Sequence, residues 1–147
     1  MLRDLLAGAV VSFVNFGVHA AMTGLIVVAT QHTANKTDHL GLFLRLTSLL
    51  TITMVALMVA HVTEIVVWAG YFTLAGITIR GADAFEFAFE NYTALGYGDV
   101  LPTDGRRLLG PIMALNGLLL IGWSVAVIFE VMRMAELQIG RDKDLSD

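Results

Sequence analysis

Residues 93–102 read Thr-Ala-Leu-Gly-Tyr-Gly-Asp-Val-Leu-Pro. Two glycines stand at alternate positions, Gly96 and Gly98, and glycine adopts backbone dihedrals that other residues resist. Successive carbonyl groups in such a segment can turn toward one side. The preceding stretch, residues 82–92, is too short and too charged to cross a bilayer, and we expect a short helix there. The C-terminal end of a helix is partly negative, so a helix that ends near Thr93 favours a cation beyond its end.

Three longer apolar runs surround this segment. They cover residues 5–30, residues 46–79, broken only by His61 and Glu64, and residues 108–127, which continue as a helical pattern to about residue 137. Each run reaches the roughly 20 helical residues that cross a bilayer. Hydrophobic residues make up 56% of the 147-residue chain and charged residues 15%, against roughly 25% in ordinary globular chains. The sequence therefore predicts an all-α membrane protein with three transmembrane helices and a re-entrant helix and loop.

Composition also excludes several classes of function. The chain has no cysteine, which excludes disulfides, thiol nucleophiles and thiolate metal sites. A net charge of −4 provides no basic surface for nucleic acid. We expect the lipid bilayer as a partner, no small-molecule substrate and no enzymatic activity. A signal peptide cleaved after Val18-His19-Ala20 is an alternative for the first run, but the run continues about ten residues further, which favours an uncleaved helix.

The glycine segment resembles the selectivity filter of potassium channels, in which Thr-Val-Gly-Tyr-Gly carbonyl rings replace the hydration shell of the ion. Here Leu95-Gly96-Tyr97-Gly98-Asp99 matches that filter, with leucine in place of valine. The resemblance covers about residues 46–132, as outer helix, pore helix, filter and inner helix. One loop cannot encircle an ion, so a single copy per chain implies a closed cyclic oligomer, which the resemblance makes a homotetramer. The whole chain is most similar to small three-span bacterial potassium channel proteins.

The resemblance also implies roles for individual residues. Glu90 and Asp99 match two carboxylates that pair behind the filter in some family members. Gly117 and Gly122 match the spacing of inner-helix glycines, of which the first is often a gating hinge. Potassium ions in the filter are the only bound species expected, with no other cofactor. The filter would consist of Thr93, Ala94, Leu95, Gly96, Tyr97 and Gly98, with potassium bound by the carbonyl groups of Ala94, Leu95, Gly96 and Tyr97.

Ala94 departs from the family pattern, which has threonine at this position. The threonine hydroxyl helps to form the innermost ion site, so a tetramer of this chain would lose four hydroxyl oxygens from one ring. We predict altered conductance or looser potassium selectivity, and a stronger inner site in Ala94→Thr. The function implied is passive, potassium-selective conduction. A weakly selective cation channel and a non-conducting membrane subunit that keeps the pore fold are the alternatives.

Several polar residues lie inside the apolar runs, where such residues are costly. His61 and Glu64 share a helix face and either couple protonation to gating or dock the outer helix on the pore helix or the first run; we favour docking. A metal site built from this pair lacks an evident third ligand, and a metalloenzyme that uses the four histidines is disfavoured. We expect Asn15 and His19 to form hydrogen bonds between helices. Asn116 faces either the ion cavity, as a gating candidate, or a neighbouring helix.

The resemblance also implies an organisation and an orientation. Residues 1–39 would form an N-terminal transmembrane helix and polar loop, residues 40–137 the pore domain, and residues 138–147 a charged tail. The N-terminus would lie outside the cell membrane and the C-terminus in the cytoplasm, although lysines and arginines divide almost evenly between the two sides. Trp68, Tyr71 and Phe72 would form an aromatic belt at the outer end of the second run.

Overall fold

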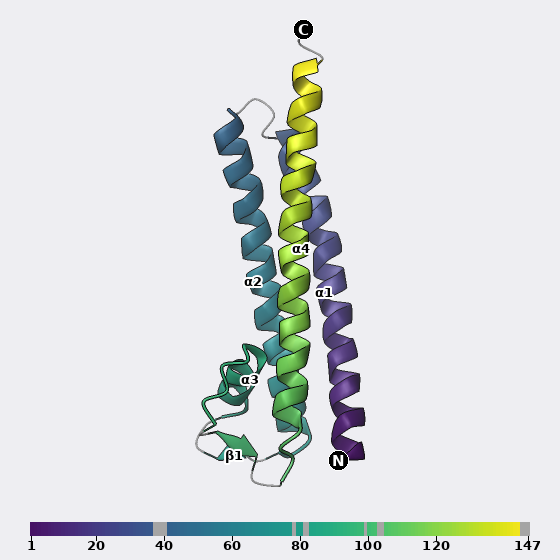
Figure 1. Ribbon diagram of the computed structural model, residues 1–147, viewed down its shortest axis with the longest axis vertical. Helices are drawn as coiled ribbons and strands as arrows, with labels where there is room; N and C mark the ends of the chain where they lie inside the picture. Colours follow the sequence, from purple (N-terminus) through teal and green to yellow (C-terminus); the bar gives the residue numbers. More distant parts are fainter. Residues whose placement is uncertain (37–40, 78, 81–82, 99, 103–104, 145–147) are drawn as a thin grey trace. The chain divides into compact units, whose positions relative to one another are not determined.

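The computed structural model describes residues 1–36, 41–77, 79–80, 83–98, 100–102 and 105–144. Within these ranges three long helices, α1 (Leu2–Lys36), α2 (Leu42–Leu74) and α4 (Leu109–Asp144), accompany one short helix, α3 (Ala84–Tyr92) (Figure 1). The two-residue strands β1 (Ile79–Arg80) and β2 (Leu101–Pro102) pair antiparallel. Each long helix contains an apolar stretch sufficient to cross a membrane. The predicted all-α membrane fold is confirmed, and the small strand pair was not predicted.

The helix boundaries differ from those of the apolar runs. Helix α2 begins at Leu42 and ends at Leu74, where Gly76, at a φ of 62°, turns the chain. Helix α4 continues to Asp144, through most of the stretch expected to be a tail. The hydropathy of the sequence identifies only the part of a helix that is rich in apolar residues. The helix itself continues through polar residues with adequate helix propensity until the backbone turns.

The chain divides into two compact units. Unit 1 consists of Met1–His19 and Ala60–Gly122, and unit 2 consists of Ala20–Val59 and Trp123–Asp147. The three junctions between the units fall inside the long helices α1, α2 and α4. The division into residues 1–39, 40–137 and 138–147 stays a prediction. The loop that resembles a filter lies wholly within unit 1.

Unit 1 has an aromatic core beside α3. Trp68 and Phe72 of α2 are fully buried, and the Phe72 ring packs edge-on against Phe87 of α3, with the ring centroids 5.1 Å apart. The predicted interfacial belt is therefore wrong for these two residues, which serve as packing side chains. Tyr71 is half-buried and packs against the cluster. The buried residues of this core are Val11, Ile65, Trp68, Ala69, Phe72, Ile77, Phe87, Ala88, Tyr92, Val100, Leu109, Met113 and Leu120.

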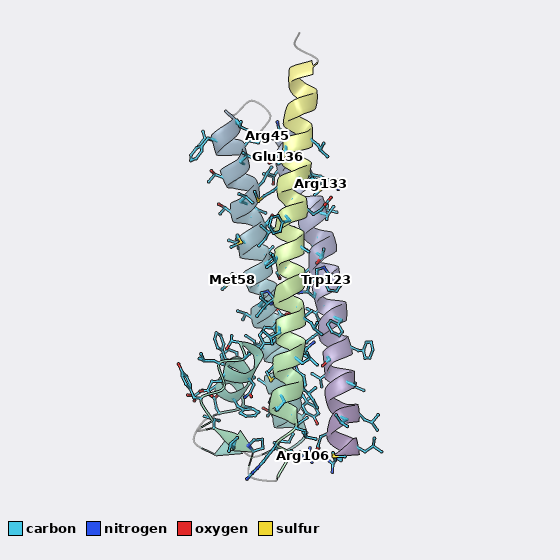
Figure 2. All side chains as sticks on the ribbon, viewed as in Figure 1. Arg45, Met58, Arg106, Trp123, Arg133 and Glu136 are labelled. Carbon is cyan, nitrogen blue, oxygen red and sulfur yellow. The ribbon has the colours of Figure 1, made fainter. Side chains whose placement is uncertain are left out.

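Unit 2 has a smaller aliphatic core. It is made of Ile26, Leu49, Leu57, Val127, Val131 and Ala135. Arg133, marked in Figure 2, forms an exposed ion pair with Glu130 one helical turn away, at 2.7 Å. This pair lies on the surface and contributes little to stability.

Both ends of α3 are fixed by local hydrogen bonds. Asp83 caps the N-terminus, where its side-chain oxygen accepts a bond from the Glu86 backbone N–H at 2.8 Å. The helix ends at Tyr92, and Thr93 is its C-cap, with its N–H bonded to the Phe89 carbonyl at 3.2 Å. The predicted end of the helix near Thr93 is confirmed, so the glycine segment starts directly at the partly negative end of α3.

Candidate functional site

The backbone after α3 alternates in handedness. Ala94, Gly96 and Gly98 have φ values of 57°, 48° and 80°, and the residues between them do not have positive φ. Alternation between left- and right-handed dihedrals turns successive carbonyl groups toward the same side. Ala94 is the only described non-glycine residue with positive φ, a conformation that costs an L-residue about 1–2 kcal/mol. Strain of this kind is concentrated at functional sites.

The start of this segment is bonded to the last turn of α3. The Glu90 backbone carbonyl accepts from the N–H groups of Leu95 at 3.0 Å and Gly96 at 3.4 Å, and the Asn91 carbonyl accepts from Ala94 at 2.9 Å. These bonds satisfy helix-end carbonyls that would otherwise lack partners. The Glu90 side chain is half-buried. Asp99, its predicted partner, lies outside the described residues, so their pairing stays a prediction.

The order of elements is now established as a long apolar helix, a short helix, a glycine loop and a second long apolar helix. A family model described as "Ion channel" matches residues 58–134, just over half of the 147 residues. The chain belongs to this ion channel family. The match begins within α2 and ends within α4, so it includes α3 and the whole glycine segment. No curated protein and no solved structure matches the chain significantly.

Membership in the ion channel family, together with three helices long enough to span a bilayer, makes this a multi-pass membrane protein. The family is a channel family and not an enzyme family. Within the single chain, Thr93 and the five following residues are all exposed. The side chain of Leu95 is 55% exposed and that of Tyr97 is 71% exposed. Such apolar exposure at a channel loop is typical of a surface that another chain covers.

The two inner-helix glycines of the channel differ in their surroundings. At Gly117 an added Cβ would lie 2.0 Å from the carbonyl oxygen of Tyr92, whereas at Gly122 nothing lies within 4 Å. Helix α4 is continuous through both positions. Gly117 therefore lets α3 approach α4 closely, a packing role that the sequence analysis did not assign. Its role in gating stays a prediction.

A buried polar cluster joins three helices of unit 1, α1, α2 and α3. The Glu64 side chain is fully buried. Its Oε1 lies 2.8 Å from Nδ1 of His19 on α1, and its Oε2 lies 3.2 Å from Nδ1 of His61 on α2. The Tyr92 hydroxyl donates to Oε2 and lies 2.8 Å from the same His61 nitrogen. Glu64 thus contacts both the first helix and the pore helix, as the docking interpretation expected.

The electrostatic environment of the cluster determines which group donates the hydrogen bond between Tyr92 and Glu64. Burial raises the pKa of the Tyr92 hydroxyl far above its usual range, and the neighbouring Glu64 carboxylate raises it further. The hydroxyl therefore stays protonated and acts as the donor. Because Tyr92 is the last residue of α3, this bond holds the end of α3 from which the glycine segment begins.

A second polar group lies next to the cluster. Asn116 of α4 is buried, and its Oδ1 accepts from Trp68 Nε1 at 3.0 Å and from Asn15 Nδ2 at 3.1 Å. Asn15 Nδ2 also donates to the Glu64 backbone carbonyl at 3.2 Å. Of the two predicted environments for Asn116, the structure shows the helix-facing one. The contact between His19 and Glu64 was not predicted, although the spacing of Asn15 and His19 placed both on one face of α1.

Proposed function

We propose that the protein is a homotetrameric, potassium-selective channel that conducts passively. The observation that carries this proposal is the alternation of positive φ at Ala94, Gly96 and Gly98 in a loop that begins at the C-terminal end of α3. Four such loops around an axis would stack carbonyl rings for dehydrated potassium ions, bound by the carbonyl groups of residues 94–97. Repulsion between neighbouring ions would drive their exit.

The exposed filter supports assembly from several chains. Tyr97 and Leu95 present apolar side chains that unit 1 does not cover. A closed ring of identical subunits would cover each of them with the same partner surface. The proposed orientation has the N-terminus outside the cell membrane and the C-terminus in the cytoplasm. Because the chain has no cysteine, single cysteines introduced near either end can be labelled from one side to test it.

Flux in liposomes tests the proposed function. Purified protein is reconstituted, and potassium uptake is compared with sodium uptake in the presence and absence of barium. The expected result is barium-sensitive flux that strongly favours potassium. Equal flux of both ions would replace the proposal with a weakly selective cation channel. An intact tetramer without flux, under conditions that open its gate, would indicate a non-conducting subunit.

A pair of glycine variants locates the conducting path. Gly98 has a φ of 80°, so Gly98→Ala strains the filter even though there is space around it. Gly17 lies on α1 with nothing within 4 Å of an added Cβ, and Gly17→Ala serves as the control. We expect Gly98→Ala to remove potassium flux and Gly17→Ala to retain it. Normal flux in Gly98→Ala would contradict conduction through this loop.

The alanine at position 94 supports a second candidate function, that of a cation channel with low selectivity for potassium over sodium. An alanine provides no hydroxyl oxygen at the inner end of the filter. If the hydroxyl ring is needed to discriminate potassium from sodium, the flux ratio of the two ions will be close to one. The same liposome measurement separates the two candidates.

A further inference from the structure

Three side chains with metal-binding atoms converge in unit 1. His19, His61 and Glu64 each present one ligand atom, and these atoms all lie within 4.8 Å of one another. The ring centroids of the two histidines are 5.5 Å apart. Both imidazoles direct Nδ1 at the same carboxylate, one to each of its oxygens, at 2.8 and 3.2 Å.

This donor set suits a divalent transition metal. Two imidazoles and one carboxylate form zinc sites, with metal–nitrogen distances of about 2.0–2.1 Å and metal–oxygen distances of about 2.0–2.2 Å. Two donors of one tetrahedral ion are then about 3.3 Å apart. The contacts of the histidines with the carboxylate, at 2.8 and 3.2 Å, are shorter than that separation, and the three ligand atoms all lie within 4.8 Å of one another. Metal binding would therefore need side-chain movements that bring the three atoms to about 3.3 Å from one another, and each imidazole would bind through a nitrogen that carries no proton.

The Tyr92 hydroxyl places a fourth donor atom next to these three. It lies 2.8 Å from the His61 nitrogen and donates to Glu64 Oε2. An ion held by His19, His61 and Glu64 would lie close to this hydroxyl, which contacts two of the three ligands. The ion would thereby connect α1 and α2 with the last residue of α3.

The charge of the cluster also favours a cation. Glu64 is fully buried in a span, and none of the contacts described for it comes from a lysine or an arginine. A carboxylate in such an environment is stabilised by positive charge. The His61 side chain is 18% exposed in the single chain, which makes it the most exposed of the three ligands. We propose that His19, His61 and Glu64 form a binding site for a divalent transition metal ion of the zinc class, a site that goes beyond potassium conduction.

The test uses the purified full-length protein after treatment with EDTA. Cobalt(II) and zinc(II) are titrated separately, and binding is followed by the visible absorption of cobalt, by metal content after gel filtration and by the thermal unfolding temperature. We expect one ion per chain and an unfolding temperature that rises with metal concentration. None of these measurements depends on ion flux, so they test the metal site whether or not the protein conducts ions. Absence of binding to well-folded wild-type protein at micromolar metal would overturn the proposal.

Histidine variants locate the ion. His61→Gln and His19→Gln should each weaken metal binding at least about tenfold. His32→Gln is the matched control, because His32 is an exposed histidine on the same helix as His19. It should leave the affinity unchanged. His61 is only half-buried, so its variant has the better prospect of folding normally if His19→Gln does not. Unchanged affinity in a folded His61→Gln protein, or loss of binding in His32→Gln, would show that the metal binds elsewhere.

Discussion

The carbonyl oxygen of Tyr92 occupies the space where a side chain at Gly117 would begin. A Cβ atom on Gly117 would lie 2.0 Å from that oxygen and 2.9 Å from the carbonyl carbon. The neighbouring group is backbone, which cannot move aside as the end of a flexible side chain can. The pore helix and the inner helix are thus in direct backbone contact at the residue that precedes the filter.

Gly117→Ala should therefore destabilise the pore unit. Overpacking of a close contact costs about 1–3 kcal/mol and occasionally more, and backbone contact places this site at the upper end. Thermal unfolding of the purified oligomer measures the loss. Gly122→Ala, on the same helix with open space around it, is the control and should change stability little. If Gly117→Ala instead alters only the open probability, with stability intact, Gly117 acts as a hinge and not as a contact residue.

Variants at Ala94 separate the effect of the hydroxyl from that of backbone strain. Ala94 has a φ of 57°, where a β-branched residue is especially unfavourable. Ala94→Ser adds a hydroxyl without the branch, so it should raise the ratio of potassium to sodium flux with little loss of stability. Ala94→Thr should raise the same ratio but lower the unfolding temperature. Ala94→Gly is the control, which relieves strain and adds no oxygen. Flux ratios that do not differ among the variants would remove any role for a hydroxyl at this position.

The hydroxyl of Tyr92 should stabilise the end of the pore helix. Tyr92→Phe removes the donor to Glu64 Oε2 and leaves the ring in place. The loss of a donor to a buried carboxylate costs about 1–3 kcal/mol. Tyr71→Phe on α2 is the matched control, since no hydrogen bond described for unit 1 involves its hydroxyl. Equal unfolding temperatures for the two variants would show that the Glu64 bond contributes nothing to stability.

Asn116 should matter for stability and not for ion selectivity. Asn116→Leu keeps a similar volume but removes the acceptor of the Trp68 indole N–H and one of the two acceptors of Asn15. Interhelical hydrogen bonds in membranes contribute about 0.6–2 kcal/mol, so the unfolding temperature should fall. Leu115→Ala, at the neighbouring exposed position, should have a smaller effect. A changed potassium-to-sodium ratio with unchanged stability would instead place Asn116 in the ion cavity.

The features predicted correctly from the sequence are those with a local signal. The spans are visible as apolar runs because membrane insertion depends on hydrophobic length. The pore helix and its end near Thr93 follow from a short mixed stretch before two alternating glycines. The Asp83 cap also had a local signal, an aspartate three residues before Glu86 at the start of the helix, which was not recognised as a cap.

The features that were missed depend on contacts between distant parts of the chain. His19 bonds Glu64 across 45 positions, and no periodicity within α1 specifies which residue of α2 it meets. Trp68 was assigned to the membrane interface because an aromatic residue near a helix end has the same sequence context in an interface and in a core. Its burial depends on contacts with the rest of the unit 1 core, including the hydrogen bond of its indole N–H to Asn116 of α4. The position of His19 beside His61 and Glu64 likewise became apparent only from the packing of α1.

The hydrogen-bond partners of α1 are synthesised after α1 itself. Asn15 and His19 lie on α1, and their partners on α2 and α4 are synthesised after them. The Asn116 side chain follows Asn15 by 101 positions. Until α4 is in place, Asn15 has its bond to the Glu64 carbonyl but not its bond to Asn116. A folding intermediate that contains only α1 and α2 would therefore keep the His19–Glu64 contact while the Asn15 amide awaits its second acceptor.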